Sequence, residues 1–372
     1  MTTQTNAKNK GEWSELYAFI KLLKEGRIYA ADENVNRLDN IYLPIIKIIR
    51  EEVKNEKIDY YTGDIIRIYK NNCLLEEIPA NELDVPTRTL FEKIFEGSRN
   101  SQSSGAFTIE EAFSFMERMH IRKVKAPSTD KIDLTMQIHD IYTGYSPEVG
   151  FSVKSDVGSP PTLLNAGKNT RIQYKVMGLN DLQIEEINNI DETVDRNYMV
   201  MRMSRLFALA ENVSFEKVKD QTFNDNLIMI DSLLPRIYGE MILKHYSEIE
   251  SGIYDCDTLV TYLTEANPMH YHNPNVYKYK IKKLITASAL GMTPGKEWDG
   301  LDSATGGYII IKRDGDVLCY HLYNRNFFEE YLLKNTRFDR PSASRYDYGY
   351  LYNENGQVFI DLNVQIRFKS IK

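Results

Sequence analysis

Residues 130–158 carry the pattern that most constrains how this chain folds. Apolar and polar residues alternate strictly over residues 132–139, which predicts a strand with one buried face and one polar face. The turn-like sequence TGYSP follows, and residues 150–155 then alternate again. When the two segments pair as a hairpin, Asp133 and Lys154 lie on the same polar face of one sheet. A carboxylate and an amine held there can bind a divalent metal and position a water, which predicts a nuclease centre.

The composition is that of an ordinary soluble globular protein. The chain has 372 residues, of which 42% are hydrophobic and 27% are charged. This length suggests about two to three domains. No apolar run approaches the ~18 residues that a membrane span needs, and the polar N-terminal segment lacks the apolar core of a signal peptide. Three widely separated cysteines, Cys73, Cys256 and Cys319, predict reduced and mostly structural thiols in a cytoplasmic protein.

The charge balance is acidic. A net charge of −7 gives no overall sign of nucleic-acid binding. A DNA enzyme of this composition would therefore need a local basic surface, because phosphate contacts are made patch by patch.

Changes in pattern divide the chain into four predicted parts. They are an N-terminal helical and β substructure (1–97), a nuclease core hairpin with a flanking helix (98–180), a mainly helical region (181–300) and a C-terminal β-rich region that is a candidate for reading DNA (301–372). The polar residues 98–105 predict a loop before the core. The chain as a whole is predicted to be an α/β (α+β) protein.

Periodicity also predicts individual elements. Three-to-four spacing predicts helices over residues 12–25, 198–210, 225–249, 257–265 and 276–290. Alternation and turn residues predict strands at 65–70 and 171–176, and hairpins that turn at Asp314-Gly315 and Asn355-Gly356. Residues 42–57 are predicted to be helical in their later part.

The polar face of the central hairpin has the residues of a metal nuclease, with one departure. Phosphodiester hydrolysis needs carboxylates that hold Mg²⁺ and a lysine that orients or activates the attacking water. The usual pattern is an Asp on one strand, then Glu or Asp, one spacer and Lys on the next. Asp133 supplies the first position and Lys154 the last, whereas Ser152 stands at the acidic position. A serine hydroxyl adds no charge, so we expect a second carboxylate from elsewhere.

Two neighbouring glutamates are the first candidates for that second carboxylate and metal ligand. Glu110 and Glu111 lie at the start of a predicted helix, which Thr108 is expected to cap while Glu111 reaches back. Glu148, in the turn of the hairpin, is the next candidate. A solvated helix surface is the alternative interpretation of the two glutamates.

Other residues of the hairpin are alternatives. Asp140 replaces Asp133 as the first acid only if a bulge intervenes, because its parity otherwise puts it on the apolar face. His139 is a secondary acid–base candidate on the polar face, although a lone strand histidine more often serves as hydrogen-bonded scaffolding. Taken alone, the Asp–Ser–Lys triplet fits a structural hairpin better than a catalytic one, because short motifs match by chance.

Longer blocks of the sequence carry a family resemblance. Residues 132–140 (IDLTMQIHD), 150–170 (GFSVKSDVGSPPTLLNAGKNT), 277–325 and 362–368 (LNVQIRF) are similar to blocks of the HpaII family of type II restriction endonucleases. The similarity extends from about Trp13 to Phe368, and several ungapped blocks are more specific than the triplet.

The resemblance implies a fold, an activity and partners. It implies a nuclease of the PD-(D/E)xK type, with a restriction-endonuclease-like mixed sheet core flanked by helices. Asp133 is then a metal ligand, Lys154 the catalytic lysine and Ser152 the residue at the degenerate acidic position. The implied reaction is Mg²⁺-dependent hydrolysis of double-stranded DNA at CCGG, and the implied partner is a DNA methyltransferase that protects the same site. A palindromic site is most simply read by a homodimer.

Two groups of residues are candidates for contacts with DNA. Reading guanine and cytosine edges needs arginines, acids and amides. The candidates are Arg340, Ser342, Ser344 and Arg345 in one loop, and Asn165, Lys168 and Arg171 just after the hairpin. Ordinary surface loops are the alternative interpretation.

Two other classes of protein remain open at this point. One is a sequence-specific DNA-binding protein whose nuclease centre has decayed, as the missing acid would allow. The other is an enzyme without a nucleic-acid substrate, in which residues 130–158 form a plain hairpin. Incubation of unmethylated plasmid with and without Mg²⁺ separates these classes.

Overall fold

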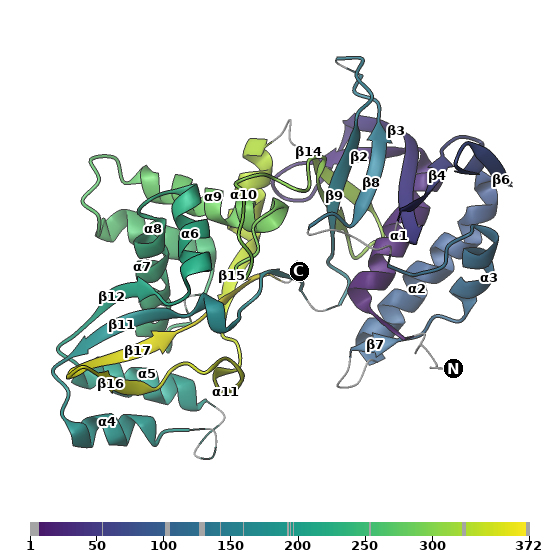
Figure 1. Ribbon diagram of the computed structural model, residues 1–372. Helices are drawn as coiled ribbons and strands as arrows, with labels where there is room; N and C mark the ends of the chain where they lie inside the picture. Colours follow the sequence, from purple (N-terminus) through teal and green to yellow (C-terminus); the bar gives the residue numbers. More distant parts are fainter. Residues whose placement is uncertain are drawn as a thin grey trace. The chain divides into compact units, whose positions relative to one another are not determined.

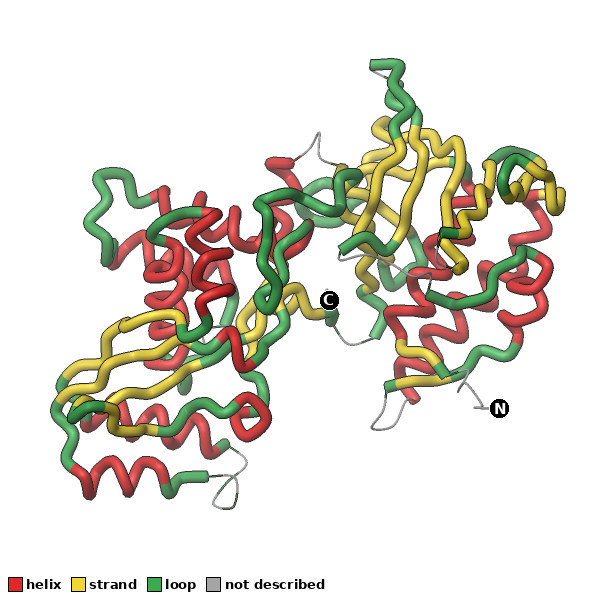
Figure 2. Tube along the Cα trace, in the orientation of Figure 1, coloured by secondary structure: helices red, strands yellow, loops and turns green. Residues whose placement is uncertain are grey.

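The computed structural model describes residues 7–369, except residues 54, 101–104, 126–130, 142, 159, 192, 194, 196, 253 and 322–324. This part of the chain mixes helices and strands, which confirms the predicted α+β class (Figure 1, Figure 2). It forms two compact units: unit 1 runs to Pro161 and includes Asp302–Tyr331, and unit 2 contains Thr162–Leu301 and Leu332–Lys369. Among the described residues, no helix is long and apolar enough to cross a membrane.

Unit 1 is built on a mixed sheet that has nine strands in the described residues. In spatial order they are β2 (Arg27–Ala31), β14 (Val317–His321), β13 (Gly307–Ile311), β9 (Glu148–Ser155), β8 (Leu134–Ile138), β3 (Arg37–Val53), β4 (Glu56–Tyr61), β5 (Ile65–Lys70) and β6 (Cys73–Pro79). Strand β13 is parallel to β9 and antiparallel to β14. The hairpin predicted within residues 130–158 (β8–β9) and the one that turns at Asp314-Gly315 (β13–β14) therefore lie side by side in one sheet.

Helix α1 (Lys10–Glu25) covers one face of this sheet (Figure 1). It contacts β9, β3, β2 and β14, and its stripe of Trp13, Leu16 and Ile20 is fully buried. Asn9 caps its first turn, and Gly26, with a φ of 64°, ends it in the left-handed conformation that glycine adopts easily. Helix α2 (Asp84–Asn100) packs on α1, and α3 (Glu111–Arg118) packs on α2. The short strands β1 (Lys8–Asn9) and β7 (Ala106–Phe107) pair beside α1.

The prediction of helix in residues 42–57 is wrong. Arg37–Val53 is one strand of 17 residues, β3, and β4 follows at Glu56. The run of isoleucines from 45 to 49 fits a buried strand as well as a helix, because a short apolar run does not distinguish the two. Pairing with β8 on one side and β4 on the other decides for the strand.

Two smaller predictions in these regions are also wrong. Helix α3 begins at Glu111 with Glu110 in a helical conformation and without a side-chain cap, so Thr108 does not cap it. The predicted loop at 98–105 is helical at its start, because α2 extends to Asn100; residues 101–104 lie outside the described residues.

Unit 2 combines two small sheets with a group of helices. The four-stranded sheet has the order β12 (Asn212–Val218), β11 (Ile172–Met177), β17 (Gln357–Leu362) and β16 (Leu351–Glu354), and the three-stranded sheet has the order β10 (Thr162–Leu164), β18 (Gln365–Phe368) and β15 (Thr336–Asp339). The helices are α4 (Asp181–Asn188), α5 (Tyr198–Leu209), α6 (Gln221–Ile230), α7 (Leu234–Ser247), α8 (Cys256–Ala266), α9 (Asn275–Leu290) and α11 (Ala343–Tyr346). The single helix predicted at 225–249 is thus two helices, α6 and α7.

Helix α7 packs against one face of the four-stranded sheet. The Tyr174 hydroxyl of β11 donates a hydrogen bond of 2.8 Å to the carbonyl oxygen of Gly239 in α7. Gln173, the neighbour of Tyr174 in β11, lies on the opposite face of the strand, and Arg171 directly precedes β11.

These units combine residues that are distant in the sequence. The boundary at 97 falls inside unit 1, because β3 pairs with β8 across it. The boundary at 300 lies next to the limit between Leu301 and Asp302. Helix α10 (Arg325–Asn335) begins in unit 1 and ends in unit 2.

Candidate active site

The β8–β9 hairpin brings Asp133, Ser152 and Lys154 together. Asp133 directly precedes β8, and its backbone N–H bonds the carbonyl of Phe151 at 2.9 Å, which fixes the register. Its Oδ2 accepts hydrogen bonds from the Val153 backbone N–H at 2.9 Å and from the Ser152 hydroxyl at 3.3 Å. The Lys154 Nζ lies 3.8 Å from the same oxygen. The two side chains predicted to share one polar face therefore meet.

Ser152 connects the other two residues. Its side chain is fully buried, and its Oγ accepts a hydrogen bond of 3.3 Å from Lys154 Nζ while it donates to Asp133. Since the Asp133 Oδ2 is engaged in this way, the Oδ1 is the atom directed toward other groups. The serine at the acidic position thus orients an acid and an amine.

A second carboxylate comes from helix α1. Lys125 Nζ lies 3.0 Å from Glu15 Oε1 and 3.5 Å from Asp133 Oδ1, so one ammonium bridges the two acids. The side chains of Glu15 and Asp133 are 13% and 11% exposed. Two nearly buried carboxylates that share a cation form the acidic part of the site.

The electrostatics of this cluster are strongly perturbed. Burial, and then the charge of Asp133, raise the pKa of Glu15 to about 7. Burial opposes the charged form of Lys125, yet Glu15 and Asp133 raise its pKa. Burial, and then the charge of Lys154, lower the pKa of Lys131 to about 8. Such perturbation is typical of functional sites.

The donor set fits a magnesium ion. Mg²⁺ is usually bound by one or two carboxylates, with water and substrate phosphate completing the shell. Asp133 and Glu15 would supply two carboxylates. Burial, and then the charge of Asp133, oppose ionisation of Glu15, and a bound cation would offset both effects. Within the described residues no group of three or more His, Cys, Asp or Glu residues could hold a metal.

The glutamates favoured by the sequence lie elsewhere in unit 1. Glu111 is 51% exposed, and its Oε1 lies 3.7 Å from Lys93 Nζ of α2. Glu110 is exposed at the start of α3. Glu148 pairs with Lys47 at 3.0 Å. In the described part of the chain, no hydrogen bond or ion pair joins these glutamates to Asp133.

The two alternatives on the hairpin hold its turn. Asp140 is buried, and its Oδ2 accepts a hydrogen bond of 2.6 Å from the Thr143 hydroxyl. The His139 Nδ1 lies 3.0 Å from Ser146 Oγ. Both residues lie at the turn end of β8, whereas Asp133 precedes its first residue.

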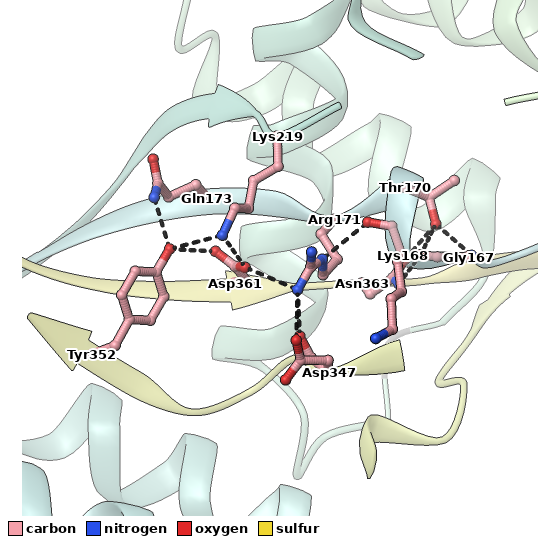
Figure 3. Close-up of polar contacts among 10 residues, drawn as sticks. All are labelled: Gly167, Lys168, Thr170, Arg171, Gln173, Lys219, Asp347, Tyr352, Asp361 and Asn363. Carbon is pink, nitrogen blue, oxygen red and sulfur yellow. Dashed lines mark hydrogen bonds and ion pairs between the residues drawn. The ribbon is translucent and has the colours of Figure 1, made fainter. Parts of the chain in front are cut away.

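In unit 2 two of the first group of predicted DNA contacts, Lys168 and Arg171, belong to a polar network (Figure 3). Asn165 and Lys168 are exposed, and Arg171 Nε donates to the Lys168 carbonyl at 2.9 Å. Arg171 Nη1 bonds the Asp347 carbonyl at 2.8 Å and lies 3.7 Å from Asp361 Oδ2. The Asp361 carboxylate also accepts two hydrogen bonds of 2.8 Å, one from Lys219 Nζ and one from the Tyr352 hydroxyl.

The second predicted group follows on the same segment as Asp347. Ser342 caps α11, with its Oγ accepting from the Arg345 N–H at 3.3 Å, and it lies 3.3 Å from Ser344 Oγ. Ser342, Ser344 and Arg345 are exposed, and Arg340 is half-buried. Because Arg171 bonds Asp347, the structure connects the two groups of candidates within unit 2.

Sequence reasoning missed Glu15, Lys125 and Lys131. Glu15 borders the apolar stripe of a correctly predicted helix, but nothing local distinguishes it from a solvated glutamate. The two lysines flank residues 126–130, which lie outside the described residues. Their proximity to Asp133 is a tertiary property, although a glutamate beside Trp13 and Leu16 on a mostly buried helix was a usable indication.

Comparison with known proteins shows the family of the chain. The family model described as HpaII restriction endonuclease matches residues 9–368. The type II restriction enzyme HpaII of Haemophilus parainfluenzae is 39% identical over 373 residues, which cover 98% of this chain and 99% of that enzyme. No solved structure matches the chain. The resemblance seen in the sequence blocks is confirmed, and the chain belongs to the HpaII restriction endonuclease family.

Proposed function

We propose that this protein is a type II restriction endonuclease that hydrolyses double-stranded DNA at CCGG with Mg²⁺ as cofactor. The observation that carries the proposal is the cluster of Asp133, Glu15 and Lys154, with Ser152 between the acid and the lysine. Family membership supports the reaction type, and the name of the Haemophilus relative supports the choice of site.

Asp133 and Glu15 would hold the cation, with Asp133 Oδ1 and Glu15 Oε1 as the atoms that now share Lys125. When bound, Mg²⁺ would supply charge stabilisation for the scissile phosphate and a lowered pKa for water. Lys125 must then move its ammonium aside, toward the phosphate. Glu110 and Glu111, the ligands favoured by the sequence, remain alternatives for a metal ligand.

Lys154 would orient the attacking water and stabilise the charge that develops on the phosphate. Its ammonium is held at the site by Ser152 Oγ and by the Val153 carbonyl at 3.2 Å, and its side chain is 26% exposed. The oxygen of water forms a bond to phosphorus as the bond to the 3′ oxygen breaks, in line, and the 3′ oxygen takes up a proton. A fixed cation aimed at the developing charge lowers the barrier without reorganisation.

Unit 2 carries the proposed recognition surface. Asn165, Lys168 and Arg171, joined through Asp347 to the loop of Arg340, Ser342, Ser344 and Arg345, would contact DNA. Arginine held by two aspartates is oriented in advance for bidentate contacts with guanine. A palindromic site is read most simply by a homodimer, and host DNA is protected by a companion methyltransferase at the same sequence, in the cytoplasm.

Incubation of unmethylated plasmid with and without Mg²⁺ tests the proposal. Discrete fragments that end at CCGG, formed only with the metal, are the expected result. A gel shift without cutting would instead identify a DNA-binding protein with a decayed centre. If the protein neither cuts nor binds the plasmid, the assignment to DNA is refuted.

A further inference from the structure

Unit 1 contains a cavity of about 1040 Å³ beside the active site. Lys125, which bridges Glu15 and Asp133, is one of the residues that line this cavity. The walls come from α1, α3, β3, β4 and the segment that follows α3. Its volume is at the upper end of the range for small-molecule pockets, about 300–1,000 Å³.

Besides Lys70 and Lys125, three cations line the cavity, and one of them, Arg122, adds to the effect of Lys70 in lowering the pKa of Glu56. Arg122 and Lys123 are exposed, Lys8 is half-buried, and none of the three forms an ion pair with a described residue within 4.0 Å. Lys70, another lining residue, is paired with Glu56 at 2.9 Å.

Most carboxylates of the lining are already engaged. Glu52 is paired with Arg50, and Glu12 accepts a hydrogen bond from the Asn9 backbone N–H. Glu56 is held by Lys70, and Glu117 is exposed on α3. The balance of unpaired charge beside Lys125 is therefore positive, although the whole chain carries −7.

A buried ion pair fixes the segment that carries these cations. Arg50 and Glu52 of β3 are 4% and 2% exposed in their side chains and lie 2.8 Å apart. Glu52 Oε2 accepts the backbone N–H of Arg122 at 2.8 Å, and Arg50 Nη2 donates to the carbonyl of Lys123, also at 2.8 Å. The backbone is anchored while the Arg122 and Lys123 side chains stay exposed.

The same arginine contacts the helix that carries the second acid. The Arg50 guanidinium lies 5.0 Å from the ring centre of Phe19, one turn after Glu15 in α1. The buried pair therefore contacts both the segment of Arg122 and Lys123 and helix α1. Such a pair is costly to bury.

We propose that this cavity binds the phosphodiester backbone of duplex DNA next to the scissile phosphate, with Arg122 and Lys123 contacting phosphate oxygens. The inference rests on the proposed function. A backbone fits better than a small anion, because the cations follow one another along the segment of Arg122, Lys123 and Lys125, and Lys125 is paired with Glu15 and Asp133. Neither Arg122 nor Lys123 is part of the proposed metal site, so their effect on DNA binding can be measured separately from catalysis.

Salt-dependent binding tests the proposal. Affinity of the wild type for a labelled duplex containing CCGG is measured by fluorescence anisotropy in EDTA, over a range of KCl concentrations. Each of Arg122→Ala and Lys123→Ala is expected to reduce the slope of log K against log[salt] by about 0.9, and the double variant by about 1.8. One lost contact corresponds to about a fivefold lower affinity at about 0.15 M salt.

Lys21→Ala is the matched control, because Lys21 lies in the same unit but pairs with Glu25 at 2.8 Å outside the cavity. Its slope is expected to equal that of the wild type. Unchanged slopes for Arg122→Ala and Lys123→Ala, or an equal change for Lys21→Ala, would overturn the inference. Absence of any duplex binding by the wild type would overturn it as well.

Plasmid cleavage by the wild type separates the inference from the proposed function. Plasmid cutting together with unchanged slopes would refute backbone binding in the cavity and would support the proposed nuclease function. Reduced slopes in the variants, without plasmid cutting by the wild type, would refute the proposed nuclease function and would support backbone binding in the cavity.

Discussion

Replacing Glu15 by glutamine tests the acidic pair directly. The Glu15 side chain is 13% exposed, and its carboxylate shares Lys125 with Asp133. Burial and the charge of Asp133 raise its pKa from 4.5 to about 7. In metal-free protein the folded state therefore keeps a proton that the unfolded chain loses between these two values.

The sign and size of the effect follow by linkage. The folded state binds more protons than the unfolded state between pH 4.5 and about 7, so the free energy of unfolding falls as pH rises through this window. A shift from 4.5 to about 7 corresponds to a loss of about 3 kcal/mol, fully developed above the folded pKa. Glu15→Gln cannot ionise, so this decline is absent and the variant is the more stable protein at high pH.

Urea denaturation in EDTA at about pH 5 and about pH 8 measures this difference. Excess Mg²⁺ at the higher pH is expected to stabilise the wild type more than Glu15→Gln, which should not cleave plasmid. Glu111→Gln, which alters a carboxylate 51% exposed on α3, is the control and should follow the wild type in stability. Parallel pH profiles for the wild type and Glu15→Gln would refute a buried carboxylate beside Asp133.

Other variants test the remaining parts of the site. Lys154→Ala and Asp133→Ala should each abolish plasmid cleavage while duplex binding, followed by gel shift, stays largely intact; normal cutting by either would contradict the assignment. Glu110→Gln and Glu111→Gln should cut at the wild-type rate in a timed digest, because neither touches Asp133, and a large loss would return them to the metal site. Glu52→Ala should lower the free energy of unfolding by about 3–5 kcal/mol, because it leaves a buried arginine unpaired, and a change near zero in urea denaturation would contradict this.

The central hairpin could be predicted because its information is local. Strict alternation before and after a turn sets the faces of both strands, so Asp133 and Lys154 were placed together correctly. Alternation did not predict that Ser152 would be fully buried, because β13 covers that edge of β9 and comes from the distant residues 307–311. Burial of a polar strand face depends on partners that periodicity does not reveal.

The errors have the same physical origin. The later part of residues 42–57 was predicted to be helical, but the pairing of β3 with its two neighbouring strands selects the extended form. Glu15 was missed because its meeting with Asp133 depends on how α1 crosses the sheet. Local patterns therefore predicted most helices and hairpins, whereas the second acid required the packed structure.

The parallel pairing of β9 with β13 has a consequence for synthesis of the protein on the ribosome. Glu15, Asp133 and Lys154 emerge early, but the strand that carries Lys154 keeps an open edge until residues 307–311 have been translated. The nascent chain can complete this sheet only when most of its length has left the exit tunnel. The sheet that positions Lys154 is therefore completed late in synthesis, although Glu15, Asp133 and Lys154 all lie in the first half of the chain.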